Sequence, residues 1–338
     1  MGLGYGLISC QRSFGDPRTW EDLYAEALAL TELAEARGLD SVWLTEHHFI
    51  DDGYMASVLP MAAAMAARTS RIEIGTGVLL APLHNPIRLA EDAATVAILA
   101  GGRFTLGMGL GWMPAEFEAL GARLDQRGRS MTEILEILSR AWTGEPVTYE
   151  GKVHRVPGVG IRPVPSHAPP MIIGGNADAA VRRAARLADG FFSNASPQRL
   201  EQQIAVATEE LERLDKDPTA FRWIYYHVIH PSSEPGLDPG GVLEHAWQVR
   251  WKYSDMDASA RRSGPLTAPP PLPDDQRESI RRSTLLGPAD HVVERLTAIR
   301  EASSVPLEFV ARSYFPTMGH PEQAEIVEWL GEEVAPYV

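Results

Sequence analysis

One pattern constrains the fold of this chain most strongly: short apolar, β-branched segments alternate with longer segments of helical periodicity. The first expected strand spans 3–9, and a helix with one apolar face is expected at 22–37, before Gly38. This strand-then-helix order repeats eight times. Because strands buried on both faces are nearly continuous apolar segments, the pattern predicts a closed parallel (β/α)8 barrel, a TIM barrel, as a single domain over 1–338.

The remaining elements follow the same order. Further strands are expected at 41–45, 71–80, 103–108, 171–173, 190–193, 223–229 and 307–312, and further helices at 55–68, 87–99, 129–142, 177–187, 200–214, 289–302 and 322–334. The segment 147–156 alternates around Glu150-Gly151, which is typical of a small hairpin. An open doubly wound sheet is the alternative fold. Eight units, and no G-x-G-x-x-G after the first strand, favour the barrel.

The connection after the seventh strand, 231–286, is unusually long and contains the proline-rich sequence TAPPPLP. A connection of this length inside a compact domain is usually either functional or disordered. On a barrel it emerges at the C-terminal rim, where active sites lie. We interpret it as a partly helical lid, and an irregular surface excursion is the alternative.

Composition excludes several classes of function. Asp and Glu number 45 against 31 Lys and Arg, and the net charge of −14 disfavours nucleic acid and anionic membranes as partners. The single cysteine, Cys10, excludes an internal disulfide and a cysteine-based metal centre. The longest apolar segment, 55–67, is too short to span a bilayer, and no export signal is visible at the start. We therefore expect a cytoplasmic protein.

Polar residues follow the second strand as Thr45-Glu46-His47-His48. Residues at the C-terminal end of a barrel strand point into the mouth, and histidine moves protons readily near neutral pH. Adjacent residues of an extended segment face opposite ways, so one of the two histidines is expected to reach the cavity. A hydrogen-bonded histidine pair at a loop junction is the alternative. We expect no metal site, because the chain has no H-E-x-x-H helix or ligand cluster at zinc spacing.

Glycines cluster at the ends of the third and fourth strands. Gly75-Thr76-Gly77-Val78 places two glycines in a strand, which indicates close approach by a ligand or tight packing. The sequence Gly107-Met108-Gly109-Leu110-Gly111-Trp112 predicts a flat floor for a planar ring system.

Gly174-Gly175-Asn176 ends the fifth strand directly before a helix starting at Ala177. Unpaired amides at a helix N-terminus bind anions, so these residues are expected to bind a phosphate. Plain capping of the helix by Asn176 is the alternative.

These features together resemble the bacterial luciferase-like monooxygenase superfamily. The resemblance covers essentially the whole chain except the proline-rich part of 231–286. Its densest blocks are VWLTEHHF (42–49), GTGVLLAP (75–82), NPIRLAED (85–92) and GGRF (101–104).

The resemblance implies a TIM barrel that holds reduced FMN, or alternatively a deazaflavin coenzyme, with its ring in the barrel mouth. His47 aligns with the histidine of the E-H-H motif that is catalytically important in luciferase, and we expect the adjacent Glu46 to be its electrostatic partner. A non-prolyl cis peptide is implied at Gly77–Val78. The residues expected to bind the cofactor are Thr76, Gly77, Val78, Asn85, Met108, Gly109, Gly174, Gly175, Asn176 and Ala177.

Two departures bear on the cofactor. Luciferase has a reactive cysteine followed by an arginine where this chain has Gly109 and Leu110. A cation near the phosphate is therefore missing, and Arg182 or Arg183 is the expected substitute. The run ending in Trp112 is similar to that of the deazaflavin-dependent branch.

The leading functional hypothesis is a flavin-dependent monooxygenase that uses reduced FMN and dioxygen on a small organic substrate. A separate flavin reductase would supply the cofactor, and the resemblance implies a homodimer. The alternatives are a deazaflavin-dependent hydride-transfer enzyme and a non-catalytic flavin-binding partner subunit. An unrelated barrel hydrolase is disfavoured because no nucleophile elbow or metal-ligand set is present.

Overall fold

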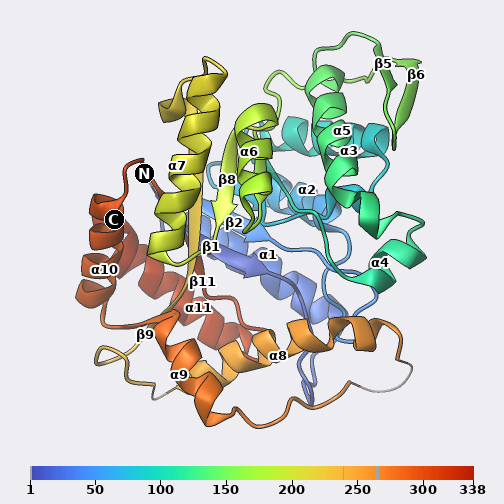
Figure 1. Cartoon of the computed structure of the whole chain (residues 1–338). Coiled ribbons are helices and arrows are strands. Elements are labelled where there is room, and N and C mark those ends of the chain that lie inside the picture. The colour runs from blue at the N-terminus through green and yellow to red at the C-terminus, as the bar shows by residue number, and fades with distance from the viewer. Residues whose placement is uncertain (1, 239, 263–265) are drawn as a thin grey trace. The chain divides into compact units, whose positions relative to one another are not determined.

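A computed structural model describes residues 2–238, 240–262 and 266–338 (Figure 1). The chain divides into two compact units. One comprises Met1–Ala56 and Tyr225–Val338, and the other Ser57–Ile224. No helix of the described ranges has the length and apolar character needed to cross a membrane.

The first unit is built on a sheet of strand order β10-β9-β11-β1-β2. β1 pairs in parallel with both β11 and β2, with Gly4 opposite Val310 on one side and Tyr5 opposite Val42 on the other. The C-terminal ends of these strands therefore lie at one edge of the sheet. The strands are β1 (Leu3–Ile8), β2 (Ser41–Leu44), β9 (Arg222–Pro231), β10 (Thr284–Gly287) and β11 (Glu308–Arg312).

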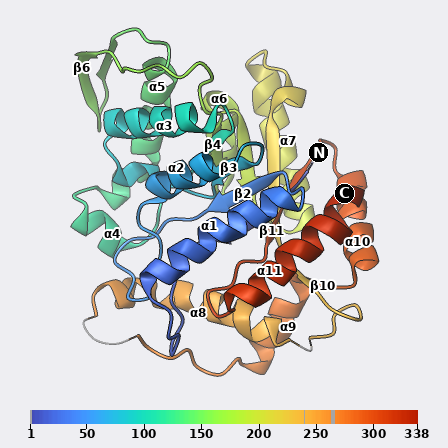
Figure 2. The same ribbon diagram turned by 180° about the vertical axis from the view of Figure 1, so that it is seen from behind.

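Helices α1 (Trp20–Ala36) and α11 (His320–Trp329) lie side by side in this unit, as Figure 2 shows. α1 begins with a capping box, in which the Thr19 hydroxyl accepts from the Asp22 amide and the Asp22 carboxylate accepts from the Thr19 amide. Its buried face includes Leu23, Ala27, Leu30 and Ala34, at the helical spacing of the sequence. The predicted helix is confirmed.

The long insertion is partly helical, as predicted. It contains α8 (Val242–Ala260) and α9 (Asp274–Arg282), and α10 (Ala289–Ala302) follows it. It also contains β10, a strand that the sequence did not suggest. β10 pairs with β9 in parallel at the edge of the sheet.

The second unit contains the parallel strands β3 (Glu73–Thr76), β4 (Phe104–Met108), β7 (Met171–Gly174) and β8 (Gly190–Ser193), in that order. An antiparallel hairpin of β5 (Val147–Glu150) and β6 (Arg155–Val159) confirms the predicted one. The helices are α2 (Val58–Arg68), α3 (Pro86–Ala100), α4 (Pro114–Ala119), α5 (Arg127–Ala141), α6 (Asp178–Leu187) and α7 (Pro197–Arg213).

Two local differences from the expected elements matter for the site. β3 ends at Thr76, four residues before the predicted end, because the chain leaves the strand at Gly77–Val78 and enters a 3-10 helix at Ala81–Leu83. The short α4 was not expected. Arg103 of the GGRF block is structural: its guanidinium donates to the carbonyl oxygens of Ala66, Thr69 and Ile72.

Candidate active site

The E-H-H segment follows β2 in the first unit. His47 is almost fully buried, and its ring packs edge-on against Tyr54 and Tyr253, with ring centroids 4.9 and 5.6 Å away. Tyr253 belongs to α8, so the insertion reaches the residue predicted to be catalytic. This position agrees with the interpretation of the insertion as a lid.

Glu46 is buried, and its Oε1 lies 2.8 Å from Nε2 of His48. The two neighbouring histidines therefore have different surroundings, as expected for adjacent residues. His47 packs against tyrosine rings, and His48 is held by a carboxylate.

A hydrogen-bonded chain of hydroxyl groups lies beside His47. The Tyr54 hydroxyl is 3.1 Å from Thr45 Oγ1, to which it donates, and 3.2 Å from the hydroxyl of Tyr253. Burial raises the pKa of Tyr54 well above its ordinary value, so its hydroxyl stays protonated at neutral pH. Sequence reasoning missed both tyrosines, because only folding brings α8 to the end of β2.

An ion-pair network ties α8 to the loop that follows the histidines. The Lys252 ammonium, itself buried, pairs with Asp51, and Arg262 pairs with Asp51 and Asp255. The Asp51 amide also donates to the Ser259 hydroxyl. These ion pairs and the Asp51–Ser259 hydrogen bond connect α8 to the loop that follows the histidines.

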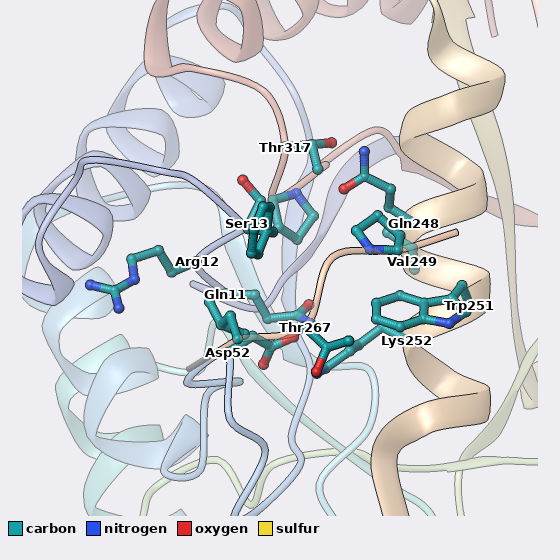
Figure 3. Close-up of a pocket in the computed structure, with 14 residues that line it drawn as sticks. Gln11, Arg12, Ser13, Asp52, Gln248, Val249, Trp251, Lys252, Thr267 and Thr317 are labelled. Carbon is teal, nitrogen blue, oxygen red and sulfur yellow. Dashed lines mark hydrogen bonds between the residues drawn. The ribbon is translucent and has the colours of Figure 1, made fainter. Parts of the chain in front are cut away.

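A pocket opens beside α8 in the same unit (Figure 3). Gln11, Asp52, Trp251 and Lys252 are among the residues that line it. Gln11 donates to Asp52 at 2.7 Å, and burial raises the pKa of the Asp52 carboxyl. A group of side chains able to hold a metal ion is absent from the described residues.

In the second unit, the peptide bond Gly77–Val78 is cis, as the resemblance implied. Val78 is partly exposed, whereas its neighbours Gly77 and Leu79 are buried. A Cβ atom built on Gly109 would lie 2.5 Å from Val78 Cγ2, and one on Gly174 would lie 2.8 Å from Val78 Cγ1. The glycines thus make room for a Val78 bulge, rather than clearing the open floor that the sequence suggested.

Two further predicted residues lie at the ends of β3 and β4. Thr76 is fully buried and donates its hydroxyl to the Gly107 carbonyl at 2.7 Å, and Met108 is also fully buried. Asn85 caps α3, because its side-chain oxygen accepts from the amides of Ile87 and Arg88. These side chains therefore have structural partners, and their contact with a cofactor stays a prediction.

The predicted phosphate loop precedes α6. Ala177, not Asn176, is the N-cap of α6, and it makes no side-chain capping bond. Gly174 and Gly175 are partly exposed, and Asn176 and Ala177 are exposed. The capping alternative for Asn176 is therefore wrong, and binding of an anion by this loop stays a prediction.

A cation at this loop comes from a helix that the sequence did not single out. Arg199 of α7 donates to the Asn176 carbonyl at 2.8 Å and pairs with Asp178. Arg182 instead pairs with Glu209 and Glu210, and Arg183 donates to Thr132. Arg199 is therefore the arginine that lies at the loop predicted to bind a phosphate.

Comparison with known proteins identifies the family. A family model described as luciferase-like monooxygenase matches residues 3–305. An F420-dependent glucose-6-phosphate dehydrogenase of Microbacterium testaceum is 28% identical over 335 residues, which cover 92% of both chains.

Solved structures show the same fold. The monooxygenase RslO1 from Streptomyces bottropensis gives a TM-score of 0.82 at 23% identity and covers 99% of both chains. The oxygenating constituent of 3,6-diketocamphane monooxygenase from Pseudomonas putida was solved with FMN. It gives a TM-score of 0.77 at 19% identity, and the match covers 100% of this chain and 99% of that chain. The predicted (β/α)8 barrel is confirmed. The chain belongs to the luciferase-like monooxygenase family, whose enzymes are oxidoreductases that use FMN or the deazaflavin F420.

Proposed function

We propose that this enzyme is a monooxygenase that uses reduced FMN and dioxygen to oxidise a small organic substrate. The observation that supports a planar cofactor is the Val78 bulge, a partly exposed apolar side chain that Gly109 and Gly174 accommodate. The loop at Gly174–Ala177, with Arg199 beside it, fits the phosphate of such a cofactor.

Reduced FMN, when bound, would supply the electrons that activate dioxygen. The residues of the chain have other roles in this proposal. His47 would hold and transfer a proton at its imidazole, while the Glu46–His48 pair fixes the segment beside it. Tyr253 and the rest of α8 would keep water from His47.

A deazaflavin-dependent hydride transfer is the second candidate. It is favoured by Leu110, which leaves the end of β4 without the luciferase arginine, and by the name of the Microbacterium testaceum relative. For either cofactor the proposal includes cytoplasmic action as a homodimer, with a flavin reductase as supplier if the cofactor is FMN.

Isotope labelling separates the two candidates. With reductase, FMN and a substrate found by screening, incorporation of oxygen from labelled dioxygen into product supports the monooxygenase. Substrate-dependent reduction of F420 without oxygen uptake would refute it in favour of the second candidate.

His47→Ala tests the catalytic role against the non-catalytic alternative. We expect turnover to fall about 100-fold or more, with cofactor affinity nearly unchanged, because proton transfer is lost while the cofactor residues stay intact. His167→Ala, at an exposed position, is the control and should behave as wild type. Unchanged turnover in His47→Ala would remove this residue from the mechanism.

A further inference from the structure

Arg312 ends β11 at the same sheet edge where β2 delivers His47. In the β1 pairings, Gly6 lies opposite Arg312 and Ile8 lies opposite Leu44, so the two strand ends are neighbours of β1 on either side. The ring of Tyr253 links the two side chains. Its centroid is 5.6 Å from that of His47 and 5.9 Å from the Arg312 guanidinium.

The surroundings of Arg312 are aromatic and carry no formal negative charge. Its guanidinium lies over the rings of Tyr226 and Tyr253, with each ring centroid 5.9 Å away. Tyr54 is a third tyrosine whose electrostatic interaction raises the pKa of Arg312. Among the residues that the structure describes, no carboxylate pairs with it. The protonated hydroxyl of Tyr54 supplies no negative charge either.

Several other arginines of the unit pair with carboxylates. Arg18, Arg262 and Arg277 each pair with a carboxylate within 2.7 Å, in a chain with an excess of acidic residues. A partly buried cation is normally paired, because removing it from water costs free energy that an opposite charge offsets. The Arg312 guanidinium is hydrogen-bonded to Tyr253, and the other donors of its planar fork can bind an oxyanion.

We propose that Arg312 binds the carboxylate or sulfonate group of the substrate, so that the enzyme acts on small organic acids. The inference rests on the proposed function, in which this acid is the molecule that is oxidised. Tyr253 would contact the bound acid group on one side and His47 on the other, which places the remainder of the molecule beside the proposed proton donor.

The test measures binding of simple acids without cofactor or turnover, so its result is independent of the proposed redox chemistry. Acetate, butyrate, octanoate and the matching sulfonates are titrated into the full-length protein, with the corresponding amides as uncharged controls. Thermal unfolding and calorimetry follow binding. We expect at least one acid to bind saturably and its amide to bind far more weakly.

Variants locate the site. Arg312→Met should weaken acid binding about 10- to 100-fold, the value of a charge-assisted hydrogen-bonded pair. Arg129→Met removes the same charge at an exposed position and should bind the acid as wild type does. If Arg312→Met does not fold, Arg312→Lys, which keeps the charge but loses the planar fork, should still weaken binding measurably.

A second arm separates the substrate from the other source of an oxyanion, the phosphate of the cofactor. FMN and F420 are titrated into wild type and Arg312→Met, and we expect equal affinities. The proposal is overturned if no acid binds, if the amides bind equally well, or if Arg129→Met loses as much affinity as Arg312→Met. It is also overturned if Arg312→Met loses cofactor affinity and keeps acid affinity.

Discussion

The Val78 bulge makes a quantitative prediction at Gly109. In Gly109→Ala the new Cβ would lie 2.5 Å from Val78 Cγ2, whereas carbon atoms in contact prefer about 3.5–4.0 Å. Val78 must therefore move by roughly 1 Å, and it is hindered on the other side because Gly174 already approaches its Cγ1. Overpacking of this kind costs about 1–3 kcal/mol of unfolding free energy.

A double-mutant cycle isolates the contact. Val78→Ala removes both Cγ atoms, so the pair Gly109→Ala with Val78→Ala should be more stable than the sum of the single changes implies, by about 0.5–3 kcal/mol. Urea unfolding of the four proteins measures the coupling, and cofactor fluorescence measures affinity, which should fall in both single variants. Gly160→Ala is the control, because its Cβ meets nothing closer than 3.5 Å.

Two results would refute this reasoning. One is a Gly109→Ala variant with the stability and cofactor affinity of wild type. The other is a double variant whose loss of unfolding free energy equals the sum of the losses of Gly109→Ala and Val78→Ala within about 0.5 kcal/mol, the limit for independent sites. Either would show that Val78 does not occupy the space beside Gly109.

Two further predictions concern buried charges. Burial opposes the ionisation of Glu133, but backbone amides of His154, Lys152 and Val153 outweigh it and lower the pKa of the carboxyl. Glu133→Gln should cost about 1–3 kcal/mol at neutral pH. Because the lowered pKa stabilises only the ionised form, the difference from wild type in urea unfolding should shrink as the pH falls below the ordinary glutamate pKa of about 4.3, and it should vanish only below the lowered pKa of Glu133. Lys252→Met leaves the Asp51 carboxylate buried with a weaker partner and should cost about 3 kcal/mol, with faster proteolysis within α8. Unchanged proteolysis would contradict the role of this ion pair in anchoring α8.

Sequence periodicity predicted the elements that are long or bounded by clear signals. α10 and β8 have the bounds expected from the sequence, and α1 begins two residues earlier and ends one residue earlier than expected. The missed elements are short: α4 has six residues, too few for a helical period, and β10 has four. The early end of β3 depends on a local backbone conformation at Gly77–Val78 that apolar patterning does not report.

The site was predictable where its residues are close in sequence. The E-H-H segment and the Gly174–Ala177 loop are local motifs, and the structure places each at a strand end. The partners of these motifs come from distant segments. Tyr253 lies about 200 residues after His47, and Arg199 belongs to α7, the second helix after the loop that it contacts. Such pairings depend on tertiary packing, and only the folded chain reveals them.

The most direct test of the central claim is an equilibrium titration of cofactor-free protein with FMN and, separately, with F420, followed by fluorescence. The account predicts one saturable site per chain for at least one of them, weakened in Arg199→Met, which removes the cation from the Asn176 loop. Absence of saturable binding for both molecules would contradict it.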